Sequence, residues 1–238
     1  MTARSQKLKE FFFRTDDHPY NILERVIDRS IRPGQVILDA GCGFTAPVLR
    51  KYKGRGCRLI GVDLVEFKME DAELELHKAN LGALPLEDNS VDLIYSRSVM
   101  EHVTNPEEVY AEFARILKPG GQFIFLTANK WDYASIAARL IPNRYHAKIV
   151  HVTEGREEED VFPTAYKSNT KGAVKKLSEE NGFMIRDFQY YGQYPSYFMF
   201  NAALFFIFSL YERLIMAVPL FKYVRGWIFV TLAKPAKP

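Results

Sequence analysis

The segment 36–45, with the sequence VILDAGCGFT, constrains the fold more than any other stretch of this chain. Its first three residues form a short apolar run bounded by turn residues, which predicts a buried strand. Asp39 follows at the carboxyl end of that strand, and Gly41 and Gly43 permit a sharp turn and the close approach of a ligand. Residues 44–52 can then begin a helix whose free N–H groups point at the same place. This combination indicates a nucleotide-type site in an α/β sheet, although the glycines alone also fit a tight connection without a ligand.

Composition narrows the class of protein further. The 238 residues are 47% hydrophobic and 26% charged, which is typical of one folded domain and excludes a disordered chain. The formal charge of +3 is too small to predict a nucleic-acid-binding face. Neither of the two cysteines, Cys42 and Cys57, has a Cys or His at metal-ligand spacing, so we expect structural thiols and no metal site. The amino-terminal residues have no apolar core of a secretory signal, so we expect a cytoplasmic protein.

Periodic apolar patterns predict an alternation of strands and helices along the chain. After the first strand, further strands are predicted at 58–62, within 76–86, and at 90–96, 122–127, 183–191 and 227–232. Helices are predicted at 20–31, 106–117 and 170–181. Up to residue 127 this alternation predicts a parallel, doubly wound α/β sheet. Residues 6–15 are basic and aromatic, and fit either a helix that caps the site or an amphipathic start packed on the core.

Two later positions belong with the glycine turn. Asp63 ends the second strand about twenty residues past the turn, the interval at which an acidic residue binds a ribose diol in dinucleotide-type folds. The alternative is an acidic residue that only ends the strand. Asn80 and Leu81 fall where the third strand ends, at the same edge of the sheet.

Four segments carry a resemblance to a known family. VILDAGCGFT, GVDL, VDLIYSRSVMEHV and ILKPGGQFIF occur in this order and at these intervals. Together they resemble the class I S-adenosylmethionine-dependent methyltransferases, in the branch with the small type 11 catalytic domain, over about residues 36–127. The resemblance implies a Rossmann-like sheet of seven strands with the last one antiparallel, helices on both faces, and S-adenosylmethionine above the carboxyl ends of the first strands.

The resemblance also implies a role for individual residues. The glycine turn would hold the methionine part of the cofactor, Asp63 the ribose hydroxyls, Asn80 the adenine edge, and Ser96 with Arg97 the floor beneath the sulfonium. The implied cofactor-binding set is Asp39, Ala40, Gly41, Cys42, Gly43, Asp63, Leu64, Asn80, Leu81, Ser96 and Arg97. This chain departs from the family pattern in two places. Phe44-Thr45 stands where a third glycine is usual, and Asn80 where Asp is usual, although its carbonyl can still accept a hydrogen bond from an amine.

The candidate catalytic residues lie after the fourth and fifth strands. His102, in Glu101-His102-Val103, is the first candidate to face the acceptor, and its alternative role is to shape the pocket. His151 and Tyr166 come next, because they follow the carboxyl end of a parallel strand and can exchange protons or donate hydrogen bonds. For each of them a purely structural role is the alternative. The expected division of a single domain is 1–35 as cap and first helix, 36–127 as core, 128–169 as substrate-side insertion and 170–238 as the last helix and strands.

An apolar insertion at 193–225 lies between the last two predicted strands, 183–191 and 227–232. Asn201, Ser209, Glu212 and Arg213 break its apolar run, so a membrane span is not expected, yet the stretch is too apolar for an exposed connection. Either its helices form a hydrophobic cap, or their outer face enters a membrane interface while Lys222 and Arg225 stay at the headgroups.

These observations lead to one expected function and its rivals. We expect an S-adenosylmethionine-dependent methyltransferase that acts by in-line transfer on a hydrophobic small molecule such as a lipid, quinone or polyketide-like acceptor. A methyltransferase for a soluble phenol or amine, with the insertion as packing or homodimer interface, is the nearest alternative. A non-catalytic cofactor-binding protein of the same fold is another. The expected location is the cytoplasm, with peripheral contact at the inner face of the membrane.

Overall fold

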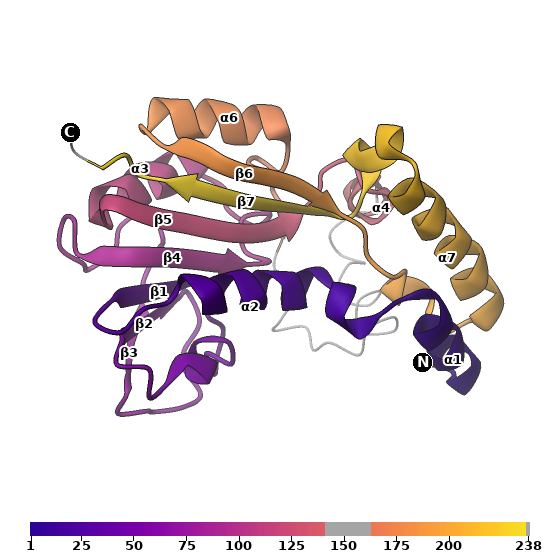
Figure 1. The fold of residues 1–238 in the computed structure, drawn as a ribbon, viewed down its shortest axis with the longest axis horizontal. Helices are drawn as coiled ribbons and strands as arrows, with labels where there is room; N and C mark the ends of the chain where they lie inside the picture. Colours follow the sequence, from indigo (N-terminus) through magenta and orange to yellow (C-terminus); the bar gives the residue numbers. More distant parts are fainter. Residues whose placement is uncertain (141–162, 237–238) are drawn as a thin grey trace.

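The fold is built on one seven-stranded sheet, seen in a computed structural model that describes residues 1–140 and 163–236 (Figure 1). The strands are β1 (Val36–Ala40), β2 (Arg58–Asp63), β3 (Leu74–Lys78), β4 (Val91–Arg97), β5 (Leu117–Ala128), β6 (Met184–Tyr191) and β7 (Trp227–Ala233). Their order across the sheet is β3-β2-β1-β4-β5-β7-β6. The pairs among β1 to β5 are parallel, whereas β7 is antiparallel to both of its neighbours. The predicted doubly wound sheet with an antiparallel last strand is therefore confirmed.

Helices cover both faces of this sheet. They are α1 (Ala3–Phe12), α2 (Pro19–Ser30), α3 (Pro106–Ile116), α4 (Tyr133–Leu140), α6 (Lys171–Glu180) and α7 (Ala202–Ala217), with short 3-10 turns at η1 (Thr15–Asp17), η2 (Leu49–Tyr52), η5 (Ser196–Phe198) and η6 (Pro219–Val224). The apolar stripe of α2 packs on one face, and α3 and α6 pack on the other. The predicted helices at 20–31, 106–117 and 170–181 are confirmed to within a residue or two at each end.

The predicted helix at 44–52 is wrong. This connection forms only the 3-10 turn η2, and Ala46 adopts a positive φ of 42°. Val48, Leu49 and Tyr52 are buried in the same cluster as the apolar stripe of α2. Because the connection packs these side chains directly on the sheet within a few residues, it has no length left for a regular helix. The connection after the glycine turn therefore contains no α-helix whose N-terminus could face the turn.

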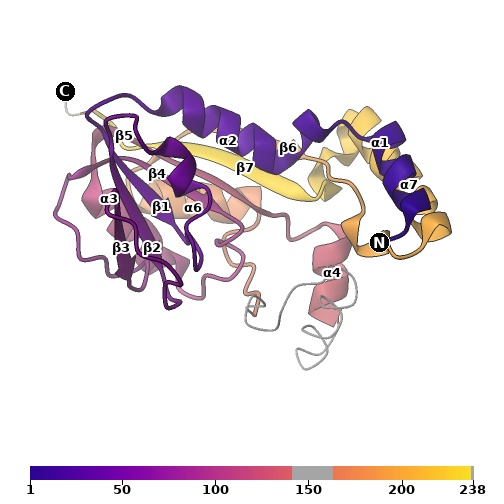
Figure 2. The same ribbon diagram turned by 90° about the horizontal axis from the view of Figure 1, so that it is seen from below.

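The insertion at 193–225 projects beyond the carboxyl ends of the parallel strands. In Figures 1 and 2, α7 stands away from the sheet and α1 lies alongside it. The rings of Phe12 and Phe206 lie 5.8 Å apart, and the Thr2 N–H donates to the carbonyl oxygen of Met199 at 3.0 Å. The amino-terminal helix thus covers the insertion rather than the sheet. Among the described helices, none combines the length and apolar character needed to cross a membrane.

Arg225 has a different role from the one expected at lipid headgroups. Its guanidinium donates to the carbonyl oxygens of Ile215 at 3.1 Å, Met216 at 3.0 Å and Tyr190 at 3.3 Å. The last turn of a helix leaves carbonyl groups without an intrahelical partner, and Arg225 satisfies two of them. It therefore fastens the end of α7 to β6, while Lys222 remains exposed.

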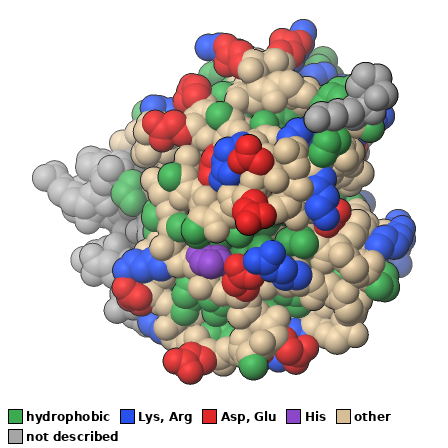
Figure 3. Space-filling view, turned by 90° about the vertical axis from the view of Figure 1, so that its left-hand side faces the viewer, with side chains coloured by type: hydrophobic (Ala, Val, Ile, Leu, Met, Phe, Trp, Pro, Cys, Tyr) green, Lys and Arg blue, Asp and Glu red, His purple; other side chains and the backbone are tan. Residues whose placement is uncertain are grey.

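The opposite end of the molecule has a different surface. The face at the amino ends of the parallel strands carries interspersed acidic and basic side chains (Figure 3). Exposed apolar side chains gather instead on the insertion, where Ile207, Leu210 and Leu214 are each about half exposed. Charged side chains of both signs are therefore interspersed at one end of the molecule, and exposed apolar side chains gather at the other.

Candidate active site

The glycine turn after β1 is shaped to leave its backbone open. The N–H groups of Gly41 and Cys42 both donate to the carbonyl oxygen of Val62, at 2.8 and 3.2 Å, which folds the turn back on β2. Gly41 has a φ of +86°, and a Cβ there would lie 2.2 Å from Cγ2 of Val99. Gly43 also has a positive φ, but no atom lies within 4 Å of the position its Cβ would take. The turn therefore packs tightly at Gly41 and presents open space at Gly43.

Asp63 closes the other side of this space. Its Oδ2 accepts a hydrogen bond from the Gly43 N–H at 2.7 Å, and its Oδ1 accepts from the Leu64 N–H at 2.7 Å. Its Oδ1 also accepts from the Val65 N–H at 3.3 Å, so it is Oδ2 that keeps a lone pair for a further donor, such as a ribose hydroxyl. The Leu64 side chain is 61% exposed at the same edge. The structure thus brings together the glycine turn and the two residues expected at the ribose and adenine.

The two departures from the family pattern have local explanations. The Lys68 ammonium lies over the Phe44 ring, 4.3 Å from its centroid. The backbone carbonyl oxygen of Phe44 accepts a hydrogen bond from the Lys68 N–H at 2.9 Å. Phe44 therefore fastens the connection between β2 and β3. The side-chain oxygen of Asn80 accepts from the Gly82 N–H at 2.9 Å and keeps a second lone pair for a ligand amine, while Leu81 is buried.

Asp39 is buried at the floor of the site. Its Oδ2 accepts a hydrogen bond from the Tyr95 hydroxyl at 3.0 Å, and the side chain is 3% exposed. Burial raises the pKa of Asp39 to about 7, against the opposing effects of the Tyr95 hydrogen bond and the Arg97 charge. A ligand cation beside this carboxyl would favour its ionised form.

Ser96 and Arg97 do not form one floor together. Successive side chains of a strand point to opposite faces, so the two residues end β4 on different sides of the sheet. The Ser96 hydroxyl is fully buried and has no hydrogen-bond partner among the described residues. The Arg97 guanidinium turns toward α2, where it pairs with Glu24 at 3.1 Å and lies 4.7 Å from the Tyr20 ring centroid. The expected placement of Arg97 beneath the sulfonium stays a prediction, and its side chain lies on the α2 side of the sheet.

Glu101 connects three segments around the catalytic candidates His102 and Tyr166. Its carboxylate is buried and accepts from the Thr127 hydroxyl at 2.6 Å. Its carbonyl oxygen accepts from the N–H groups of Ala165 and Tyr166, at 2.7 and 3.0 Å. Asn169 donates to the Thr127 hydroxyl oxygen at 2.6 Å. This network joins the segment after β4, the end of β5 and the residues before α6.

The catalytic candidates differ in what their surroundings permit. His102 Nδ1 lies 3.0 Å from the Pro163 carbonyl oxygen, which can only accept, so Nδ1 donates this hydrogen bond. Tyr166 is 6% exposed, and burial raises the pKa of its phenol, which keeps it neutral near pH 7. It can therefore donate a hydrogen bond but not act as a base. His151 lies outside the described residues.

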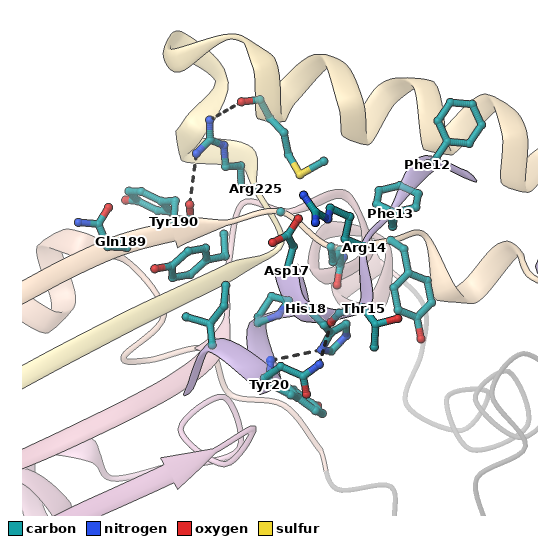
Figure 4. A pocket seen from close by; sticks show the side chains of 18 of the residues that line it. Phe12, Phe13, Arg14, Thr15, Asp17, His18, Tyr20, Gln189, Tyr190 and Arg225 are labelled. Carbon is teal, nitrogen blue, oxygen red and sulfur yellow. Dashed lines mark hydrogen bonds between the residues drawn. The ribbon is translucent and has the colours of Figure 1, made fainter. Parts of the chain in front are cut away.

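One groove was not predicted from the sequence, and its lining includes Arg97 but neither His102 nor Tyr166. It has a volume of about 840 Å³ and lies between the α1–α2 connection, the end of β6 and α7 (Figure 4). Tyr20 and Arg97 line its inner end, and the Tyr20 hydroxyl is hydrogen-bonded to Ser98, one residue past β4, at 2.8 Å. Its walls come from segments as far apart in the chain as Lys9 and Arg225, so no local pattern predicts it.

Comparisons with known proteins agree with this arrangement. Residues 38–125 match the family described as methyltransferase domain. The 24-methylenesterol C-methyltransferase 2 of Arabidopsis thaliana is 36% identical over 144 residues, which cover 56% of this chain and 38% of that protein. The chain spans less than half the length of this and the next curated relatives that it matches.

Solved structures share the fold at low identity. The geranyl diphosphate C-methyltransferase from Streptomyces coelicolor A3(2) superposes with a TM-score of 0.59 and 14% identity, covering 90% of this chain and 78% of that one. The [4+2]-cyclase SpnF gives the same TM-score and identity, covering 91% and 81%. These two enzymes have different activities, so the fold alone does not decide the reaction.

Proposed function

Because residues 38–125 place this chain in the class I S-adenosylmethionine-dependent methyltransferase family, we propose that it methylates a hydrophobic small molecule such as a lipid, quinone or polyketide-like compound. The observation that carries the proposal is the presence of two spaces at the carboxyl ends of parallel strands. One is the open cradle at Gly43 and Asp63, and the other is a groove with aromatic walls whose lining includes Arg97, the last residue of β4. The first suits the cofactor, and the second suits an apolar acceptor.

The residues present fit S-adenosylmethionine. The open space at Gly43 admits a ligand against the backbone, and the partnerless hydroxyl of Ser96 and the carboxylate of Asp63 supply polar contacts. Asp39 supplies a buried carboxyl suited to the ammonium of the methionine part. When bound, the sulfonium supplies an activated methyl group, so the protein has mainly to align the acceptor with it.

Proton transfer then depends on the acceptor. His102 is the candidate to take a proton from a phenol or an enolisable carbon, and the hydrogen bond from its Nδ1 to the Pro163 carbonyl oxygen orients the ring. Tyr166 is suited to orient the acceptor by donating a hydrogen bond from its neutral phenol. An acceptor that carries no acidic proton needs neither group as a base.

Methyl-labelled S-adenosylmethionine tests the proposal directly. Purified protein is incubated with the label and a cell extract, and the products are divided between organic solvent and water. We expect label in the organic phase, and its loss in Asp63→Asn, which removes the negative charge and one acceptor oxygen at the end of β2, where the ribose is expected. The exposed Glu87→Gln is the matched control. Label only in water would favour a soluble phenol or amine, and no label despite cofactor binding would favour a non-catalytic protein.

We also propose that the protein works in the cytoplasm, with α7 in contact with the inner face of the membrane. Ile207, Leu210 and Leu214 repeat at helical spacing on the exposed side of α7, while Phe205 and Ile215 are buried on the other side. Flotation with phosphatidylcholine vesicles should recover the wild type and lose Ile207→Ser/Leu214→Ser. If instead the wild type stays with the protein fraction as a dimer that the same variant dissociates, the surface is a homodimer interface.

A further inference from the structure

The groove beside the active site carries an excess of positive charge. Of the described residues that line it, five are Lys or Arg and two are Asp or Glu. Two of the cations have partners, because Arg97 pairs with Glu24 and Arg225 donates to backbone carbonyl groups. The cations left over are Lys9, Arg14 and Arg213, and the exposed carboxylate left over is Asp17.

These three cations approach the groove from different elements. Arg14 follows α1 and Arg213 belongs to α7, and neither guanidinium forms an ion pair with any residue in the described ranges. Lys9 lies over the Tyr194 ring, 4.0 Å from its centroid. In Figure 4, Arg14, Asp17 and His18 occupy the middle of the groove, below α7 and above the start of α2. An anion entering here would meet unneutralised charge from both walls.

The positive charges around the groove also act on His18. Burial lowers the pKa of its imidazole, and the charges of Lys9 and Arg97 lower it further. A histidine in its neutral form adds no positive charge to that of the nearby cations. It also fixes the wall, since His18 Nδ1 accepts a hydrogen bond from the Tyr20 N–H at 3.2 Å.

The charged groove is continuous with the apolar side of the insertion. Phe12 and Phe13 line the groove, and the Phe12 ring also packs against Phe206 of α7. Arg213 stands between Leu210 and Leu214, which are about half exposed. A molecule with its charged end at Arg213 can therefore lay an apolar chain along α7.

We propose that this groove binds the phosphate group of an amphiphile, with its apolar chain along α7. A phosphate monoester carries up to two charges and three acceptor oxygens, which matches two guanidinium groups and an ammonium better than a carboxylate does. The inference rests on the proposed function, because it names the chemical class of the acceptor. The phosphate then lies at Arg14 and Arg213, in a groove whose lining also includes Tyr20 and Arg97 beside the end of β4.

Binding of dodecyl phosphate tests the inference without any turnover. Calorimetric titration below the micelle concentration compares it with dodecanol, which has the same chain and no charge. We expect dodecyl phosphate to bind wild type at least about tenfold more tightly than dodecanol. The double variant Arg14→Gln/Arg213→Gln should lose that difference, whereas the matched control Arg186→Gln, an exposed arginine of β6 outside the groove, should keep it.

Vesicles distinguish the source of the phosphate. Stronger binding to phosphatidylcholine vesicles when they contain phosphatidic acid, with the increase lost in Arg14→Gln/Arg213→Gln, identifies a lipid headgroup. Binding of dodecyl phosphate with no difference between vesicles with and without phosphatidic acid identifies a soluble phosphorylated amphiphile. Equal affinity for dodecyl phosphate and dodecanol, or an unchanged difference in the double variant, would overturn the inference. Neither result depends on S-adenosylmethionine, so the inference and the methyltransferase activity fail separately.

Discussion

Asp39 links cofactor affinity to pH at the scale of one residue. Its pKa of about 7 is set by burial, so near neutral pH much of the carboxyl is protonated. A bound ammonium favours the ionised form, and binding then releases a proton, so affinity rises with pH until the pH exceeds the pKa. We expect S-adenosylhomocysteine to bind about tenfold more tightly at pH 8 than at pH 6, by calorimetry. Asp39→Asn should bind more weakly and show only the pH dependence of the ligand itself; an unchanged profile in this variant would remove Asp39 from the binding step.

The two glycines of the turn separate folding from binding. In Gly41→Ala the new Cβ meets Val99 in a backbone conformation that disfavours side chains, so we expect a loss of unfolding free energy of about 2 kcal/mol or more. In Gly43→Ala the Cβ enters open space, so we expect a loss of about 1 kcal/mol from the positive φ alone, but much weaker cofactor binding. Thermal unfolding and calorimetry on both variants check this. Equal cofactor affinity in wild type and Gly43→Ala would show that the cradle is not used.

At the scale of the element, α7 depends on a residue outside itself. Arg225 donates to two carbonyl groups in the last turn of the helix and to one in β6, which ties the two elements together. We expect Arg225→Met to raise hydrogen exchange about tenfold or more in α7 while β1, β4 and β5 stay protected. The neighbouring Lys222→Met is the control, since Lys222 is exposed. Unchanged exchange in α7 would mean that packing alone holds the helix.

At the scale of the whole molecule, two buried carboxyl groups join the insertion to the rest of the chain. Burial raises the pKa of Glu212 to about 8 and that of Asp132 to about 6, and each has one oxygen with no partner in the described part of the chain. The Gln193 side chain approaches Asp132 at 3.5 Å and its backbone N–H approaches Glu212 at 3.4 Å. Both carboxyl groups therefore lie beside Gln193, two residues past the end of β6.

Stability should consequently fall as pH rises. Both folded-state pKa values lie above those of the unfolded chain, so the folded state binds more protons and their contribution is lost between about pH 4 and pH 8. We expect the midpoint of thermal unfolding to drop by roughly 4 °C or more from pH 5 to pH 8. Glu212→Gln should flatten part of that slope, because it keeps the shape without the titration, while Asp132 and the buried Asp39 supply the rest. A slope equal to that of the wild type would place the pH dependence elsewhere.

The sequence by itself determined the cofactor half of the molecule. The apolar runs, the glycine turn and the position of Asp63 are local signals, and a parallel sheet needs little more than their order to bring the strand ends together. Only the helix expected at 44–52 failed there, because burial of Val48, Leu49 and Tyr52 against the sheet overrode local helical spacing.

Only the tertiary structure decided the acceptor half. The groove, the cap that Arg225 places on α7 and the pairing of α1 with α7 each join segments far apart in the chain. The same holds for Ser96 and Arg97, whose opposite directions follow from the strand but whose partners come from packing. Local patterns fix which residues form strands and turns, whereas the partners of a long charged or aromatic side chain depend on contacts that no short window of sequence contains.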